Sequence, residues 1–296
     1  MTAGIPAVLI EAFSDRPCQG NGAAVVALPH PVSDPWMQGV ARSLNQSETA
    51  FVLQLGGQWC LRWFSPTCEV PLCGHATLAA LLALQHWGTV DAASRTVFFT
   101  RSGPLPVGLS GPLAQIELPA ALLQVAEAPA DLTLWLRQQA CSVDTFWRSS
   151  MGYSAALLTP ESALESLPQP PLEPPEAAGL VLMQALSEAE ALPLVAGRKP
   201  DYQLRFFAPG LGIAEDPVTG SAHALVAPYW QQRLGRQQVV GWQCSDRPGG
   251  MVCDSTPSGM IRLSGTGSLL WSGHLQLRST DSDGSAERWR QLCTPG

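Results

Sequence analysis

The chain is poor in charge. Only 14% of its 296 residues are charged, against 46% that are hydrophobic, and the formal net charge is -7. This composition excludes a disordered chain and predicts a sizeable core, in one large domain or two of ordinary size. Lysine and arginine form no cluster along the sequence. A nucleic-acid partner is therefore not expected.

Long apolar runs are also missing. None approaches the ~18 residues that a membrane helix needs, so no membrane partner is expected. The N-terminus has no basic segment followed by an apolar core and a small-residue cleavage site, and residues 7–13 resemble a strand instead. We therefore expect no signal peptide and a cytoplasmic protein.

The spacings typical of metal and nucleotide sites are absent as well. The eight cysteines contain no CxxC pair, and the five histidines show no HExxH or similar pattern. There is no P-loop, and no GxGxxG follows a strand. These absences predict free thiols, no metal and no cofactor.

What the chain does contain is an internal repeat. Residues 69–78 (EVPLCGHATL) and 215–224 (EDPVTGSAHA) share Glu, Pro, Gly and Ala at matching positions, 146 residues apart. We call these segments the first and second helix starts. Just upstream, residues 62–66 (RWFSP) resemble 205–209 (RFFAP) at a spacing of 143. Two matching blocks in the same order indicate two similar halves.

Each copy has the same local order, in which a strand ends at proline, a turn follows and an apolar helix begins. The first helix is predicted at 75–87, capped by Gly88, and the second at 221–233, closed near Gly235. Pro228 should kink or shorten the second helix. Short strand-like segments fill the rest, which predicts an α+β class. The halves are assigned to residues 1–120 and 121–296, and the last strand is allowed to return to the first half.

The two helix starts are candidate binding sites. A helix N-terminus presents unpaired N–H groups and partial positive charge, and Gly74 and Gly220 let a small carboxylate approach closely. His75, in the first turn, should be neutral because the helix dipole lowers its pKa. Asp216 is either a turn-former or an acid/base, and Ser221 is either an N-cap or a substrate ligand.

Glu48 precedes an apolar strand within residues 45–52 (NQSETAFV). One interpretation is an exposed carboxylate at a strand end. The other is a general acid/base whose pKa is raised by desolvation near apolar walls.

Several strings resemble the PhzF-like (phenazine biosynthesis-like) family, which has the diaminopimelate epimerase fold. The matching strings are EAFSDRPCQGNGAAVV (11–26), NQSETAFV (45–52), RWFSPTCEVPLCGHATLAA (62–80), RFFAPGLGIAEDPVTGSAHALVAPYW (205–230) and, more weakly, RLSGTGSLLWSGHL (262–275). The resemblance implies two pseudo-symmetric domains, each an incomplete β-barrel wrapped around a central helix, with the active site at a cleft between them. It also implies a frequent homodimer.

The resemblance further implies an isomerase that moves a proton on a small carboxylate without metal or organic cofactor. Glu48 of the SET motif would be the acid/base. His75 and Asp216 would orient substrate or relay protons. The residues expected to bind substrate are Asn21, Cys73, Gly74, Gly220 and Ser221.

Two alternatives remain. Racemases of this fold use one cysteine at each helix start, and this chain has Cys73 at the first but Thr219 at the matching position of the second. An epimerase that relies on Cys73 is thus the rival enzyme, although the mismatch disfavours two-thiol chemistry. The third hypothesis is a non-catalytic protein that binds a metabolite or a partner.

Overall fold

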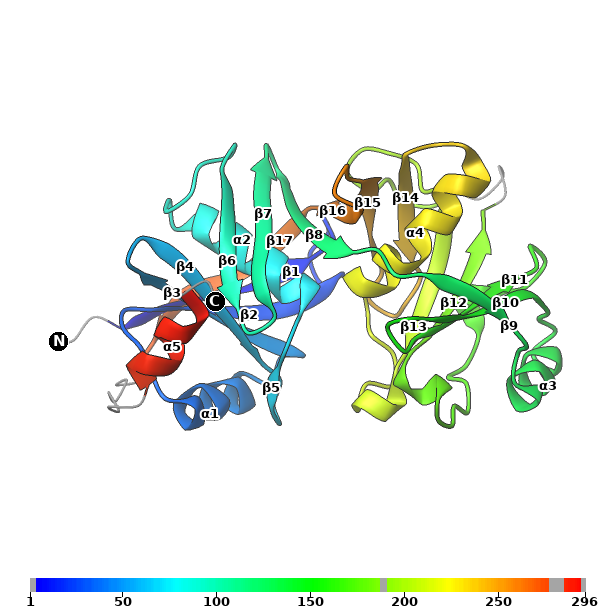
Figure 1. Cartoon of the computed structure of the whole chain (residues 1–296), viewed down its shortest axis with the longest axis horizontal. Helices are drawn as coiled ribbons and strands as arrows, with labels where there is room; N and C mark the ends of the chain where they lie inside the picture. The colour runs from blue at the N-terminus through cyan, green and yellow to red at the C-terminus, as the bar shows by residue number, and fades with distance from the viewer. Residues whose placement is uncertain (1–3, 187–190, 277–284, 294–296) are drawn as a thin grey trace. The chain divides into compact units, whose positions relative to one another are not determined.

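The computed structural model describes residues 4–186, 191–276 and 285–293. The chain divides into two compact units. Unit 1 runs to Glu117 and resumes at Gly265, and unit 2 is Leu118–Ser264. Each unit is a curled, mostly antiparallel sheet around one apolar helix, α2 (Gly74–His86) in unit 1 and α4 (Gly220–Leu234) in unit 2 (Figure 1). The predicted α+β class, with a sheet around a central helix in each half, is confirmed.

Unit 1 holds nine strands and two further helices in the part of the chain that is described. The sheet order is β17–β1–β2–β3–β4–β6–β7–β8, in which β2–β3 and β4–β6 are parallel pairs. Its elements are β1 (Ile5–Ala12), β2 (Asn21–Leu28), α1 (Asp34–Leu44), β3 (Glu48–Leu55), β4 (Gln58–Phe64), β5 (Glu69–Val70), β6 (Arg95–Thr100), β7 (Gly103–Ser110), β8 (Leu113–Pro119), β17 (Gly267–Leu275) and α5 (Ser285–Cys293).

Unit 2 repeats this plan. Its order is β9–β10–β11–β12–β13–β14–β15–β16, with β11–β12 and β13–β14 parallel. Its elements are β9 (Leu123–Ala126), α3 (Ala130–Gln138), β10 (Val143–Ser149), β11 (Ser154–Leu158), β12 (Leu180–Ala185), β13 (Tyr202–Phe207), β14 (Gln238–Gln243), β15 (Gly249–Ser255), β16 (Met260–Gly265) and three short 3₁₀ turns, η1 (Leu164–Ser166), η2 (Glu176–Ala178) and η3 (Pro209–Leu211). The eight strands β9–β16 correspond in order to β17, β1–β4 and β6–β8 of unit 1. Each neighbouring pair is parallel or antiparallel in both units alike. The duplication therefore extends over whole units, well beyond the two similar strings.

The central helices are apolar on every side because their sheets surround them. In α2 the leucines and alanines are buried among the strands of unit 1, which explains a sequence without a polar face. Helix α4 continues through Pro228 to Leu234, so a shortened helix is excluded, and the other alternative, a kink at Pro228, stays a prediction. Burial of Leu225, Ala227 and Trp230 outweighs the hydrogen bond that proline cannot donate. None of the described helices is long and apolar enough to cross a membrane.

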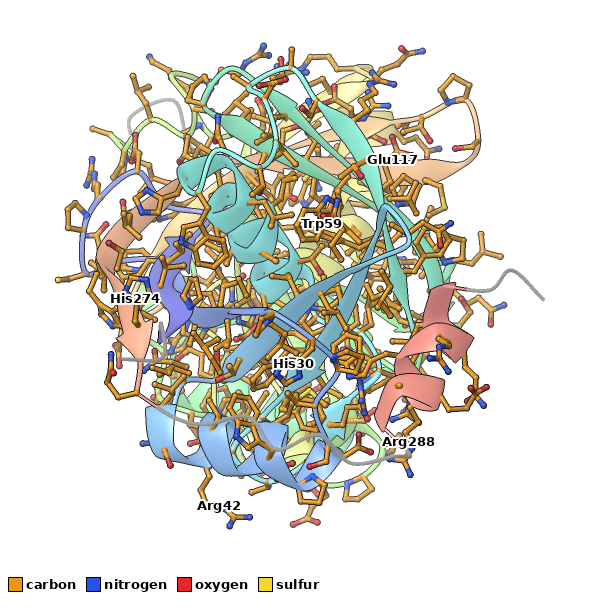
Figure 2. The ribbon with its side chains drawn as sticks, turned by 90° about the vertical axis from the view of Figure 1, so that its left-hand side faces the viewer. His30, Arg42, Trp59, Glu117, His274 and Arg288 are labelled. Carbon is orange, nitrogen blue, oxygen red and sulfur yellow. The ribbon has the colours of Figure 1, made fainter. Side chains whose placement is uncertain are left out.

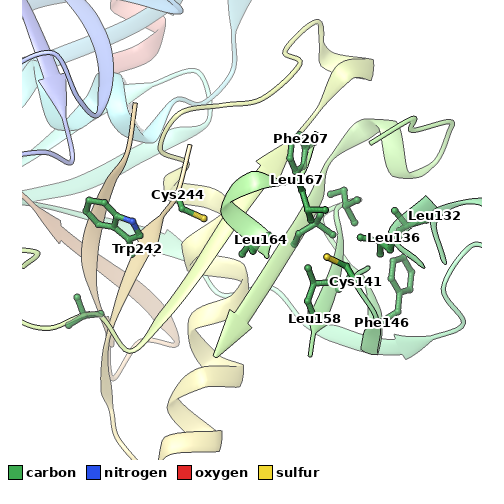
Figure 3. Close-up of a cluster of buried hydrophobic side chains, with 14 of the residues drawn as sticks. Leu132, Leu136, Cys141, Phe146, Leu158, Leu164, Leu167, Phe207, Trp242 and Cys244 are labelled. Atoms are coloured by element: carbon green, nitrogen blue, oxygen red, sulfur yellow. The ribbon is translucent and has the colours of Figure 1, made fainter. Parts of the chain in front are cut away.

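Further helices cover the outer faces of both sheets. In unit 1, Met37 of α1 and Trp289 of α5 pack on Phe51 and Phe64, and Figure 2 shows Arg42 and Arg288 projecting outward from these helices. In unit 2, α3 packs against β10–β12 in a separate apolar cluster (Figure 3). Each unit therefore has its own apolar cluster on the outer face of its sheet.

The thiol prediction fails at one position. Cys60, buried on β4, is disulfide-bonded. The spacing argument could not detect this bond because a disulfide pairs residues that are close in space and not along the chain. The free cysteines among the described residues are Cys18, Cys68, Cys73, Cys141, Cys244 and Cys253.

Candidate active site

The first helix start presents the open end of α2. Cys73 is the N-cap, with extended backbone (φ -147°, ψ 109°), and the first helical bond runs from the Thr77 N–H to the Cys73 carbonyl, at 3.1 Å. The N–H groups of Gly74, His75 and Ala76 therefore precede the helical ladder, as expected at a helix N-terminus. Gly74 is partly exposed. This end suits a small carboxylate, because it offers both donors and a partial positive charge.

Glu48 lies in the same unit, at the beginning of strand β3. Glu48 is the first residue of β3 and pairs with Ala23 of β2 in parallel register. Asn21 is the first residue of β2, so the parallel pairing places both strand beginnings at one edge of the sheet. Glu48 is only 9% exposed. The interpretation as a solvent-exposed strand end is therefore wrong.

Glu48, Cys73 and His75 form one buried cluster. The Glu48 Oε2 lies 3.2 Å from His75 Nε2 and accepts a hydrogen bond from the Cys73 thiol at 3.6 Å. The Cys73 Sγ lies close to both ring nitrogens of His75, 3.4 Å from Nδ1 and 3.8 Å from Nε2. Each of the three side chains thus contacts both of the others.

The pKa values of Glu48 and His75 are shifted in the directions opposite to those expected from the sequence. Burial by itself raises the pKa of Glu48, but hydrogen bonds from His75, Cys73 and Ser47, with the charge of His75, outweigh it and leave that pKa below its usual value. Burial opposes a charge on His75, but Cys73 and Glu48 raise its pKa well above the usual value. Both directions were mispredicted, because the neighbours of each group, Cys73 and Glu48 for His75 and chiefly His75 for Glu48, outweigh burial.

Cys73 stays a thiol in this setting. Burial raises its pKa to about 11, against the opposing effect of His75. The cluster at neutral pH is therefore a Glu48 carboxylate, a His75 imidazolium and a neutral thiol. A neutral thiol is a poor nucleophile and base, since reactivity belongs to the thiolate.

Ser47 connects the cluster to Asn21. Its Oγ lies 3.1 Å from His75 Nε2, donates to the Gly22 carbonyl at 3.1 Å, and lies 3.3 Å from Asn21 Oδ1. Asn21 is buried beside it. The structure thus brings together the predicted residues of unit 1, and adds Ser47, which the sequence argument did not single out.

At the second helix start, neutral groups surround the carboxylate of Asp216. Thr219 is the N-cap of α4, and its hydroxyl donates to Asp216 Oδ2 at 2.5 Å. The buried Gln243 accepts the Thr219 N–H at 2.8 Å and donates to the Asp216 carbonyl at 2.6 Å. Gly220 and Ser221 are the first two residues of the helix, so the N-cap interpretation of Ser221 is wrong.

Strand register identifies what replaces Glu48 in unit 2. Arg62 pairs with Phe51 across β3–β4, and Arg205 of the repeat pairs with Leu182 across β12–β13. Glu48 lies three residues before Phe51, and Gly179 lies three residues before Leu182, so the two positions correspond. A Cβ at Gly179 would lie 2.5 Å from the Tyr153 ring. Unit 2 therefore has neither a carboxylate nor space for one at this position.

Both helix starts are supported in the same way. Arg62 donates to both oxygens of Glu69 at 2.7 and 2.8 Å, and Arg205 donates to both oxygens of Glu215 at 2.7 and 2.6 Å. The repeat contained all four residues, and a repeated arginine with a repeated glutamate is the signal that could have predicted these pairs.

A pair of serines supports the same turns. Ser102 Oγ donates to the Pro71 carbonyl and Ser245 Oγ to the Pro217 carbonyl, each at 2.7 Å. No matching string surrounds these serines, so the sequence could not reveal them.

The comparisons with known proteins agree with this geometry. Residues 10–273 match the family described as phenazine biosynthesis-like protein, so the chain belongs to that family. An uncharacterized isomerase of Pseudomonas aeruginosa is 35% identical over 270 residues, covering 90% of this chain and 97% of that protein. The human phenazine biosynthesis-like domain-containing protein is 33% identical over 297 residues, covering 92% and 99%.

Solved structures give the particular fold. A PhzC/PhzF protein from Clostridium difficile superposes with a TM-score of 0.80 at 28% identity, covering 92% of this chain and 100% of that one. A hydroxyproline epimerase from Agrobacterium vitis, with bound trans-4-hydroxy-L-proline, has a TM-score of 0.58 at 9% identity, covering 96% and 95%. That second likeness concerns the fold alone, which is the diaminopimelate epimerase-like fold predicted from the sequence.

Proposed function

We propose that the chain is an isomerase that moves a proton between carbon atoms of a small carboxylate, with Glu48 as the general acid/base. Family membership and the isomerase named among its relatives support the class. The observation that carries the proposal is the buried Glu48 carboxylate, held ionised by His75 beside the open end of α2.

The proton balance needs no other reactant. The Glu48 carboxylate accepts a proton from a carbon next to an unsaturated or carboxylate group, and becomes a neutral acid while the substrate becomes a delocalised anion. The acid then returns the proton to a different carbon, which restores the carboxylate. Because the pKa of Glu48 is low, its acid form gives the proton back readily.

His75 and the helix N-terminus have distinct tasks in this reaction. The helix N–H groups at Gly74 and His75 bind the substrate carboxylate. The His75 imidazolium, whose pKa is raised, stabilises the negative charge that develops on the substrate. Ser47 contacts the ring and donates to Asn21, which remains a predicted substrate contact. Asp216, Gly220 and Ser221 remain predicted substrate contacts from the second helix start.

The hydroxyproline epimerase of the same fold holds an amino acid, which is a small carboxylate. This supports the substrate class but not the substrate. The cytoplasmic location, the absence of a cofactor and the homodimer stay predictions.

Replacing Glu48 by Gln tests the proposal, because the amide keeps the shape and cannot accept a proton. Purified protein is incubated with a panel of small unsaturated carboxylates in deuterium oxide, and carbon-bound deuterium is followed by NMR. The wild type should incorporate deuterium, and E48Q should be slower by roughly 10³-fold. The matched control is E127Q, at an exposed glutamate, which should act as wild type. Full activity in E48Q would refute the proposal.

Two other outcomes separate the alternatives. If Cys73→Ser abolished exchange and E48Q did not, the chain would be a cysteine-dependent epimerase, which the high pKa of Cys73 disfavours. If E48Q and wild type bound the same carboxylate tightly and neither exchanged deuterium, the non-catalytic binding protein would be the answer.

A further inference from the structure

The Glu48–Cys73–His75 cluster has the composition and spacing of a metal site. Its three candidate ligand atoms lie within 4.8 Å of one another, and all three side chains are buried. A carboxylate, a thiol and an imidazole are ligands that zinc accepts, whereas magnesium and calcium prefer oxygen atoms alone. Spacing along the chain gave no sign of this set, because Glu48 comes from a strand and the other two residues from a helix start.

The distances within the cluster fit tetrahedral coordination. Zinc–ligand bonds of ~2.0–2.3 Å imply tetrahedron edges of roughly 3.3–3.5 Å. The edges observed between Glu48 Oε2, Cys73 Sγ and His75 Nε2 are 3.2, 3.6 and 3.8 Å. Because the Cys73 Sγ lies nearer to His75 Nδ1, at 3.4 Å, than to Nε2, at 3.8 Å, the His75 ring must turn before its Nε2 lone pair and the sulfur can share one ion.

We propose that Zn²⁺ binds reversibly to Glu48, Cys73 and His75 and inhibits the protein. Three protein ligands leave a fourth position for water or a substrate carboxylate. Bound zinc displaces the thiol proton and the imidazolium proton to solvent. It also holds the Glu48 oxygen that must accept the substrate proton. Only the inhibition rests on the proposed function; the binding does not.

Binding is tested on chelator-treated full-length protein, by calorimetric titration with Zn²⁺ in excess Mg²⁺. One equivalent should bind. Loss of outer ligand-supporting groups costs ~10–100-fold in metal affinity, so removing the direct ligand in C73S should weaken binding by about 100-fold or more. The matched control is C68S, at an exposed free cysteine, which should bind as wild type. Equal affinity in C73S and wild type, or loss in C68S, would overturn the site.

Cobalt gives a second test that does not depend on one variant folding. Co²⁺ should produce a thiolate-to-metal charge-transfer band and the intense visible bands of four-coordination in wild type. Both should vanish in C73S and in H75Q. A six-coordinate spectrum in wild type would contradict the proposal.

Inhibition is read from deuterium exchange. Zn²⁺ should stop it, and a chelator should restore it fully. Activation by Zn²⁺, or loss of activity on chelation, would overturn the inhibitory role. If no substrate exchanges with or without chelator, the proposed function fails while the calorimetric result still decides the site.

Discussion

The turns that precede α2 and α4 are built from the same supports but carry different chemistry. In both, an arginine binds a glutamate through two hydrogen bonds, a serine holds the carbonyl of a proline, and an extended N-cap leads into a glycine. The functional positions diverge. Cys73 and His75 of unit 1 correspond to Thr219 and Ser221, and Glu48 corresponds to Gly179 by strand register.

The proposed base, Glu48, therefore has no counterpart in unit 2. The backbone of each helix start is retained, because it depends on the supports and on the buried helix behind it. At the three divergent positions unit 1 holds titratable groups and unit 2 holds a glycine and two hydroxyl residues, while unit 2 has its own carboxylate at Asp216. The predictions below change the shared supports and the divergent positions separately.

The largest effect is expected from the arginines. Arg62 is 3% exposed and lies between the rings of Phe64 and Trp289, at 5.3 Å from each centroid. Arg205→Met removes the cation of Glu215, and Arg62→Met leaves Glu69 with only the exposed Arg101. Each change should cost about 3–5 kcal/mol of unfolding free energy. Denaturant titration measures this. Similar losses of unfolding free energy in the two variants would show that both helix starts depend on the same arginine–glutamate pair. A neutral effect in one alone would contradict the equivalence.

A smaller loss is expected at Gly179. Gly179→Ala places a methyl group 2.5 Å from the Tyr153 ring and 3.0 Å from Phe206. Overpacking of this kind costs roughly 1–3 kcal/mol. Gly39→Ala is the matched control, because a Cβ there meets nothing within 4 Å. If thermal unfolding showed G179A as stable as wild type, unit 2 would have space for a side chain after all.

The smallest effects are expected at the two serines. Ser102→Ala and Ser245→Ala each remove one hydrogen bond to a proline carbonyl, worth about 0.5–1 kcal/mol. In steady-state kinetics on a substrate found by deuterium exchange, S102A should raise KM more than it lowers kcat, since Ser102 holds the turn of the helix start that we propose binds the carboxylate. Unchanged stability in both variants would show that these bonds do not support the turns.

The sequence predicted the fold and the helix starts well, and the local chemistry poorly. The strings around Gly74 and Gly220 are short and contiguous, so a repeat could reveal them. Strands β10–β12 lie in a segment without matching strings, so their equivalence to β1–β3 is visible only from pairing. The charges of Glu48 and His75 were predicted one at a time. Each depends on the other group, which lies 27 positions away along the chain and 3.2 Å away in space.

The ionised pair also gives a pH dependence. The pKa of Glu48 is lower in the folded protein than in the unfolded chain. Its contribution to stability is therefore present at pH values above the unfolded pKa and is lost as pH falls through the folded pKa. Because the pKa of folded His75 is raised, its contribution is present below 6.5 and is lost as pH rises through the folded value.

Unit 1 holds a Glu48 carboxylate paired with a His75 imidazolium, and NMR titration of the histidine rings measures this pairing. His223, buried in α4, is the internal contrast, because burial lowers its pKa to about 3. We expect ¹⁵N shifts of an imidazolium at His75 well above pH 6.5, of a neutral ring at His223 throughout the folded range, and a clear fall in the His75 pKa in E48Q. A neutral His75 ring at pH 7 in the wild type, or a His75 pKa unchanged in E48Q, would contradict this pairing.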